Sequence, residues 1–106
     1  MFARRVSIQL KPNSSAALTE KLEKEVLPLL RKQAGFQDEI TFQSQDGMKA
    51  FGISLWDRKE SAENYIRETY PAVEKILAPL VEGNPQVGSY LVSTSTFHKI
   101  TPAVAS

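Results

Sequence analysis

The sequence predicts an α+β domain with the element order β-α-β-β-α-β, the ferredoxin-like arrangement of a four-stranded antiparallel sheet with both helices on one face. Three observations predict it: an alternating first strand, a hairpin signal at Asp46-Gly47, and two helical segments between strands. The chain has 106 residues, which is an ordinary size for one domain. We therefore expect residues 1–106 to form a single domain.

The first strand and helix are expected near the N-terminus. Apolar and polar side chains alternate over residues 6–10, which is typical of a strand with one apolar face. Residues 13–15 offer capping oxygens for a helix whose apolar stripe comprises Leu18, Leu22, Val26, Leu29 and Leu30. Pro28 lies inside this stripe and predicts a bend, and Gly35 is expected to end the helix.

The central hairpin should join strands at residues 36–44 and 48–56, because Asp46-Gly47 tolerates the positive φ of a tight turn. In the second of these strands, large apolar residues at 51, 53 and 55 oppose small residues at 50, 52 and 54. Neither face suits water. We therefore expect the helices to cover one face and a second copy of the chain to cover the other, which predicts a homodimer.

The second helical region and the last strand complete the order. Asp57 and Glu60 form a start like a capping box, and Pro71 fits the first turn of a further helical segment that ends before Gly83 and Pro85. Residues 87–97 are rich in β-branched and aromatic side chains and predict a long final strand. Residues 98–106 are expected to form a short C-terminal tail that either wraps a neighbour or is loose.

Composition disfavours several classes of function. Lys and Arg number 13 against 12 Asp and Glu, and the basic residues are spread along the chain, so neither nucleic acid nor a membrane is an expected partner. No cysteine is present, and the single histidine, His98, has no cluster of carboxylates around it, so no metal site is predicted. His98 is expected to be exposed or to anchor the tail. No leader or membrane-spanning segment is recognised, and a cytoplasmic location is expected.

The chain resembles the antibiotic-biosynthesis-monooxygenase-like (ABM-like) members of the dimeric α+β barrel superfamily over roughly residues 6–96. The residues that carry the resemblance are Phe42, Ser44, Asp46, Gly47, Trp56, Asp57, Glu60, Ala62 and Tyr65, together with Gly35-Phe36 and Tyr70-Pro71. This resemblance implies a dimeric α+β barrel. The superfamily contains cofactor-free oxygenases of aromatic polyketides, haem-degrading enzymes, isomerases, decarboxylases and members without an established activity.

The resemblance assigns the aromatic residue at the end of the third strand to Trp56. For the cofactor-free oxygenases it implies an asparagine four positions earlier, where this chain has Gly52. For the haem-degrading branch it implies a histidine on the second helix, and residues 58–82 contain none. That branch also has an asparagine on the first strand, where the inward candidates here are Ser7 and Gln9. No cofactor is therefore predicted.

A ligand pocket is expected beside the tryptophan. The six candidate residues are Trp56, Tyr65, Gln9, Ser7, Ser54 and Gly52. Small side chains on the face of a large one leave space that a ligand can fill. Both aromatic residues have a packing alternative, Trp56 as a core or interface anchor and Tyr65 as a contact between helix and sheet. Tyr65 would need a neighbouring charge to act as an acid near neutrality, so no catalytic residue is assigned.

Two functions of different class remain open. The first is a cofactor-free monooxygenase or isomerase that acts on a small aromatic or polyketide-like substrate. An electron-rich substrate anion can itself pass an electron to oxygen, so such a protein mainly positions and desolvates it. The second is a non-catalytic dimer that binds a small apolar ligand or serves as an accessory subunit.

Overall fold

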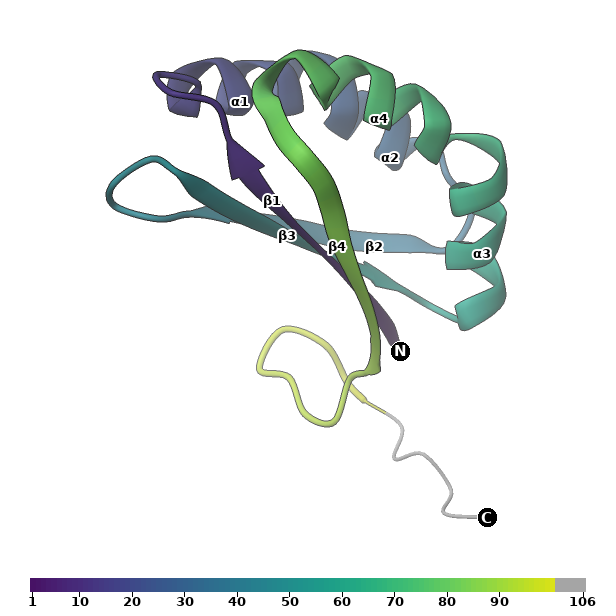
Figure 1. The fold of residues 1–106 in the computed structure, drawn as a ribbon. Coiled ribbons are helices and arrows are strands. Elements are labelled where there is room, and N and C mark those ends of the chain that lie inside the picture. Colours follow the sequence, from purple (N-terminus) through teal and green to yellow (C-terminus); the bar gives the residue numbers. More distant parts are fainter. Residues whose placement is uncertain (101–106) are drawn as a thin grey trace.

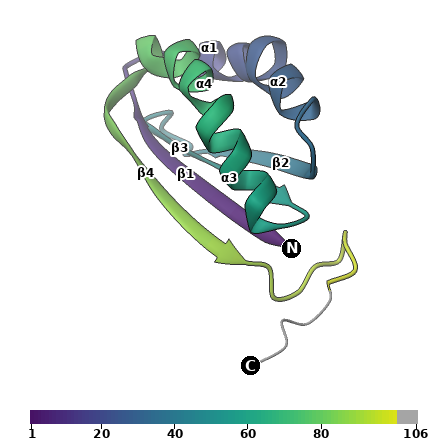
Figure 2. The ribbon, with the colours of Figure 1, turned by 90° about the vertical axis from the view of Figure 1, so that its right-hand side faces the viewer.

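The structure, a computed structural model that describes residues 1–100, contains one four-stranded sheet (Figure 1). Its strands are β1 (Phe2–Leu10), β2 (Phe36–Gln43), β3 (Lys49–Trp56) and β4 (Val81–Leu91). They pair antiparallel in the order β2-β3-β1-β4. All the helices cover the same face of this sheet (Figure 2). The predicted ferredoxin-like α+β fold is confirmed.

The first helical region is a run of three segments, α1 (Ser15–Lys21), the π-helical turn η1 (Leu22–Val26) and α2 (Leu27–Arg31). Pro28 is the second residue of α2, and because α2 continues directly from η1 it lies inside a continuous helical run, where it cannot donate to a carbonyl of the preceding turn. A π-helical turn, η1, lies immediately before Pro28. The bend expected at Pro28 stays a prediction.

The second helical region comprises α3 (Lys59–Glu68), α4 (Tyr70–Leu77) and the 3-10 turn η2 (Ala78–Leu80). Pro71 lies in the first turn of α4, as expected. The predicted capping box at Asp57 is wrong, because no side chain caps α3. Asp57 Oδ1 instead accepts a hydrogen bond of 2.6 Å from the Ser61 hydroxyl, inside the helix.

The last strand begins and ends six residues earlier than predicted, at Val81–Leu91 in place of 87–97. Gly83, with a φ of 70°, and Pro85 suggested a turn, but both lie within β4. The register with β1 passes from Ser7–Gln86 to Gln9–Glu82, so residues 83–85 form an irregularity in β4, and pairing continues on both sides of it. Because β4 is an edge strand, the missing N–H of Pro85 can face away from the ladder.

The chain after β4 runs on the side of the sheet away from the helices (Figure 1). Val92 N donates a hydrogen bond of 3.0 Å to Met1 O, and the His98 ring contacts the carboxylate of Asp38 on β2. Within the described residues, His98 therefore anchors this segment to the sheet. The rest of the predicted tail, residues 101–106, lies outside the described residues.

The core lies between the helices and the sheet and centres on Trp56. This side chain is completely buried, with the Phe36 ring edge-on at 5.5 Å and the Tyr65 ring at 5.1 Å. Phe2, Val26, Leu30 and Val73 complete the cluster, and a smaller one surrounds Leu10 and Leu18. Packing of this layer sets the height of the helices above the sheet, and hence the space left between them.

The opposite side of the sheet, called the open face below, carries the other alternate residues of the strands. Phe42 and Phe51 lie directly opposite each other and stack at 4.8 Å, and the Arg5 guanidinium lies 4.6 Å from the centre of the Phe51 ring. Ile40 and Phe42 are 44% and 46% exposed in the single chain. The expected cover from a second copy of the chain stays a prediction.

Candidate functional site

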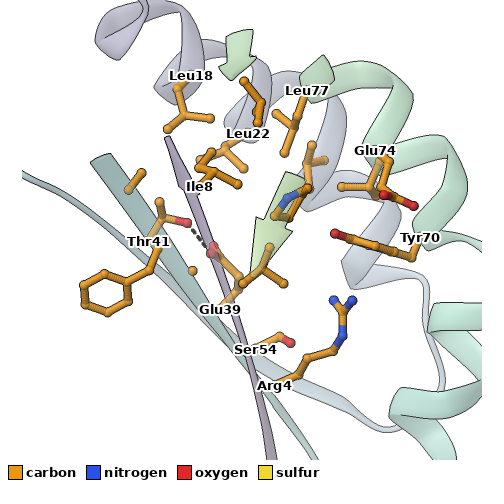
Figure 3. A pocket seen from close by; sticks show the side chains of 18 of the residues that line it. Arg4, Ile8, Leu18, Leu22, Glu39, Thr41, Ser54, Tyr70, Glu74 and Leu77 are labelled. Carbon is orange, nitrogen blue, oxygen red and sulfur yellow. Dashed lines mark hydrogen bonds between the residues drawn. The ribbon is translucent and has the colours of Figure 1, made fainter. Parts of the chain in front are cut away.

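A cavity of about 300 Å³ lies between the helices and the sheet (Figure 3). Its floor comes from β1, β2 and β3, and its walls come mainly from the first helical region, from α4 and from the start of β4. This volume is at the lower end of the range for small-molecule sites. Most of the lining is apolar, and the chief apolar residues are Val6, Ile8, Leu18, Leu22, Val26, Leu30, Ala50, Val73 and Leu77.

The register of the sheet places three polar side chains in one row on the cavity floor. Arg4 on β1 lies directly opposite Ser54 on β3, and Ser54 lies directly opposite Glu39 on β2. Directly opposite residues of antiparallel strands project to the same face, so all three face the helices. The cavity floor therefore has a cation at one side and a carboxyl group at the other, with the Ser54 hydroxyl between them.

Gly52 provides room for the carboxyl group. A Cβ at this position would lie 3.1 Å from Glu39 Oε1 and 3.3 Å from Thr41 Oγ1, closer than ordinary packing contacts. The Thr41 hydroxyl donates a hydrogen bond to Glu39 Oε1, shown as the dashed line in Figure 3. The absence of a side chain at Gly52 thus allows the pair formed by Glu39 and Thr41 to occupy the floor.

Glu39 is the side chain best placed to accept a proton in the cavity. Burial raises the pKa of its carboxyl group, and the hydrogen bond from Thr41 lowers the pKa by a smaller amount. A carboxylate with a raised pKa holds a proton more strongly and is a better general base near neutral pH. Glu39 can therefore take a proton from a ligand hydroxyl group.

Tyr65 lines the cavity from α3 and is almost fully buried. Burial raises the pKa of its hydroxyl to about 12, and the positive charge of Arg4 opposes this rise. Tyr65 thus keeps its proton at neutral pH and is a hydrogen-bonding or packing group there. Arg4 is the neighbouring charge that lowers the pKa of Tyr65, but it lowers this pKa by less than burial raises it.

Trp56 lies at the end of β3 and does not line the cavity. Its indole Nε1 donates a buried hydrogen bond of 2.9 Å to Ser54 Oγ, and Ser54 lines the cavity. This is the packing alternative that the sequence left open. Trp56 supports the floor through Ser54, and direct contact of a ligand with its ring has no basis in this geometry.

The structure brings together three of the six predicted pocket residues at the cavity surface, namely Gly52, Ser54 and Tyr65. The inward placement of Ser7 and Gln9 is wrong. Phe2, Arg4, Val6, Ile8 and Leu10 face the helices, so the residues between them face the other way. Ser7 and Gln9 line a separate hollow of about 550 Å³ on the open face.

Sequence reasoning missed five charged and hydroxyl groups of the cavity, Arg4, Glu39, Thr41, Tyr70 and Glu74. One signal was available for Arg4. The alternation of apolar residues that starts at Phe2 places this arginine on the apolar face, where a charge is unusual. For Glu39 no such signal was available. The register of β2 shifts between Phe36 and Asp38, so alternation counted from Phe36 does not predict that Glu39 faces the helices.

Within residues 1–100, no three His, Asp or Glu side chains are grouped so that they could hold a metal ion. Over the same range, no helix has the length and apolar character needed to cross a membrane.

Solved structures with the same fold include several ABM-like proteins, although no family model and no curated protein matches the sequence. The monooxygenase ActVA-Orf6 of Streptomyces coelicolor, in complex with nanaomycin D, is 20% identical, with a TM-score of 0.76 over 96% of this chain and 92% of that chain. The cofactor-independent oxygenase SnoaB of Streptomyces nogalater is 11% identical, with a TM-score of 0.72 over 90% and 95%.

The NE2512 protein of Nitrosomonas europaea, whose function is unknown, is 16% identical, with a TM-score of 0.75 over 96% of this chain and 95% of that chain. These similarities extend over nearly the whole domain. The chain therefore has the ABM-type fold. At such low identity the likeness concerns the fold, and a function has to be argued from the site.

Proposed function

We propose that the protein binds a small phenolic aromatic or polyketide-like compound in the cavity and oxidises it as a cofactor-free monooxygenase. One observation carries this proposal: a partly buried carboxyl group with a raised pKa, Glu39, lines a mostly apolar cavity large enough for a small molecule. The ABM-type fold, which is also that of a cofactor-independent oxygenase, supports it.

In this reaction Glu39 takes the proton of the phenolic hydroxyl. The phenolate passes one electron to O₂, and the resulting radical and superoxide combine at the ring carbon para to the oxygen. The peroxide anion so formed takes the proton back from Glu39, and the hydroperoxide then loses water to give a quinone. One O₂ thus yields one quinone and one water without an added reductant. Apolar walls strip water from the phenolate and so raise its tendency to give up an electron.

Oxygen uptake tests this proposal. We expect 1-naphthol in air to yield 1,4-naphthoquinone, with O₂ consumed and quinone formed in equal amounts, and with no loss of rate after treatment with EDTA. Glu39→Gln should lower the rate about 100-fold or more, because it removes the base. Glu82→Gln is the control, since Glu82 of β4 pairs with Gln9 of β1 and does not line the cavity.

Three results would overturn the monooxygenase proposal. They are the absence of uptake with every hydroxynaphthalene offered, loss of the activity with EDTA, and an unchanged rate in Glu39→Gln.

The second candidate function is a non-catalytic protein that binds a small apolar ligand. It is favoured by Gly52, which brings no polar group to the position where the resemblance implies asparagine, and by the firmly protonated hydroxyl of Tyr65. Saturable quenching of the fluorescence of Trp56 by 1-naphthol, together with no oxygen uptake, would support this function over the first. Trp56 is the only tryptophan of the chain, so the signal comes from beside the cavity.

We also propose that two copies of the chain pack through the open face to form the dimer. Half-exposed Ile40 and Phe42 and the stacked Phe51 give this face the apolar character of a homodimer interface. Sedimentation of the whole chain at micromolar concentration tests this. A strict monomer would contradict it.

A further inference from the structure

Arg4 is the only charged side chain of residues 1–100 that is almost fully buried, at 4% exposure. Burying a charge is unfavourable unless another charge or several hydrogen bonds compensate it. Most arginines therefore keep the guanidinium group in water, and the burial of this one requires an explanation.

No protein group of the described range pairs with this charge. The four ion pairs found in residues 1–100 involve other side chains, and the buried Arg4 Nε has no hydrogen-bond partner. Glu39, the carboxyl group of the same floor, lies two strands away across Ser54, so their backbones are about 10 Å apart. Glu74 of α4 lines the same cavity, and it forms no ion pair with Arg4 either. Within residues 1–100 the cation therefore has no paired carboxylate.

The guanidinium group is nevertheless held in one place. It lies 4.1 Å from the centre of the Tyr70 ring, and Figure 3 shows it extending from β1 toward this ring of α4 along one side of the cavity. A cation stacked on an aromatic face is partly stabilised, and its N–H groups at the edge stay available. Arg4 is therefore an oriented donor at the border of an apolar cavity.

We propose that Arg4 binds the carboxylate of an aromatic ligand, so that the cavity selects aromatic carboxylates over their neutral analogues. A carboxylate matches the two parallel donors of a guanidinium group, and the aliphatic walls accommodate the ring. This inference deepens the proposed function, because it rests on the aromatic ligand and defines its class. With Glu39 at the other side of the floor, the substrate is a hydroxylated aromatic carboxylic acid.

Binding of 2-naphthoate and 2-naphthamide, measured by titration calorimetry, tests this inference. The two probes have nearly the same shape and differ in charge, and neither has a hydroxyl group that could react. We expect the wild-type protein to bind 2-naphthoate about tenfold to a hundredfold more tightly. Arg4→Met should abolish this preference while binding of the amide changes little, and Arg4→Lys should keep part of it.

Arg5→Met is the matched control, because Arg5 is the next residue of β1 and stacks on Phe51 of the open face. Its preference for 2-naphthoate should equal that of the wild type. A residue with a merely structural role would alter both affinities together or neither, so loss of the charge preference alone is specific to anion binding.

Equal wild-type affinities for the two probes would overturn the inference, and this comparison needs no variant to fold. A preference that persists in Arg4→Met would overturn it as well. Oxygen uptake is measured separately with 1-naphthol. If no oxygen is consumed, the monooxygenase proposal fails, and the preference for 2-naphthoate can still be observed. If the two probes bind equally, the inference on Arg4 fails, and oxidation of 1-naphthol can still be observed.

Discussion

Replacing Ser54 with alanine should destabilise the protein by removing the only side-chain partner found for the Trp56 indole. Nε1 donates to Ser54 Oγ at 2.9 Å, and the tryptophan is completely buried, so the substitution takes away the partner of a buried donor. Leaving a buried donor unsatisfied costs about 1–3 kcal/mol. For a domain of this size each kcal/mol lowers the Tm by about 4–8 °C, so a fall of at least about 4 °C is expected.

Urea unfolding followed by circular dichroism measures this loss, and a double-mutant cycle assigns it to the hydrogen bond. Trp56→Phe removes the indole N–H, so Ser54→Ala should cost at least about 1 kcal/mol less in that background than in the wild type. Ser7→Ala is the control, because Ser7 lies on the open face, and it should change the unfolding free energy by less than about 0.5 kcal/mol.

Two results would refute the reasoning on Ser54. One is a Ser54→Ala variant as stable as the Ser7→Ala control. The other is an equal cost of Ser54→Ala with and without the indole, which would mean that the loss comes from packing. Either result would also remove the basis for placing Trp56 as a support of the cavity floor.

The remaining predictions concern a titratable group, a turn and the open face. Because burial raises the pKa of Glu39 in the folded state, its ionisation lowers stability as the pH rises from the unfolded to the folded pKa. The unfolding free energy of Glu39→Gln should therefore exceed that of the wild type at pH values above the folded pKa, and this advantage should vanish at pH values below the unfolded pKa. A difference between the two proteins that does not change with pH would contradict this. Gly35→Ala should lower the Tm more than Gly83→Ala, since both have positive φ but only a Cβ at Gly35 meets other side chains; equal losses would argue otherwise. Phe42→Lys should shift sedimentation toward the monomer, and an unchanged coefficient for a dimeric wild type would exclude this face as the interface.

Much of the fold could be predicted because its signals are local. The hairpin needs only positive φ at Gly47, which is 72°, and the bonds that close it join Ser44, Gly47 and Lys49 within a few residues. The small residues of β3 alternate with large ones, and the structure places them on the cavity side as the period of two requires. Each of these features depends on residues that are neighbours in the chain.

Contacts between distant segments decided what the sequence alone left open. β4 begins six residues earlier than its composition suggested, because pairing with β1 resumes at Glu82 and Val81, beyond the irregularity that contains Gly83 and Pro85. The burial of Arg4 depends on Tyr70 of α4, which packs against its guanidinium group and is far from it in the sequence. A strand pattern specifies the face on which a side chain lies, whereas the depth of a cavity depends on how tightly helices and sheet, far apart in sequence, fill the space between them.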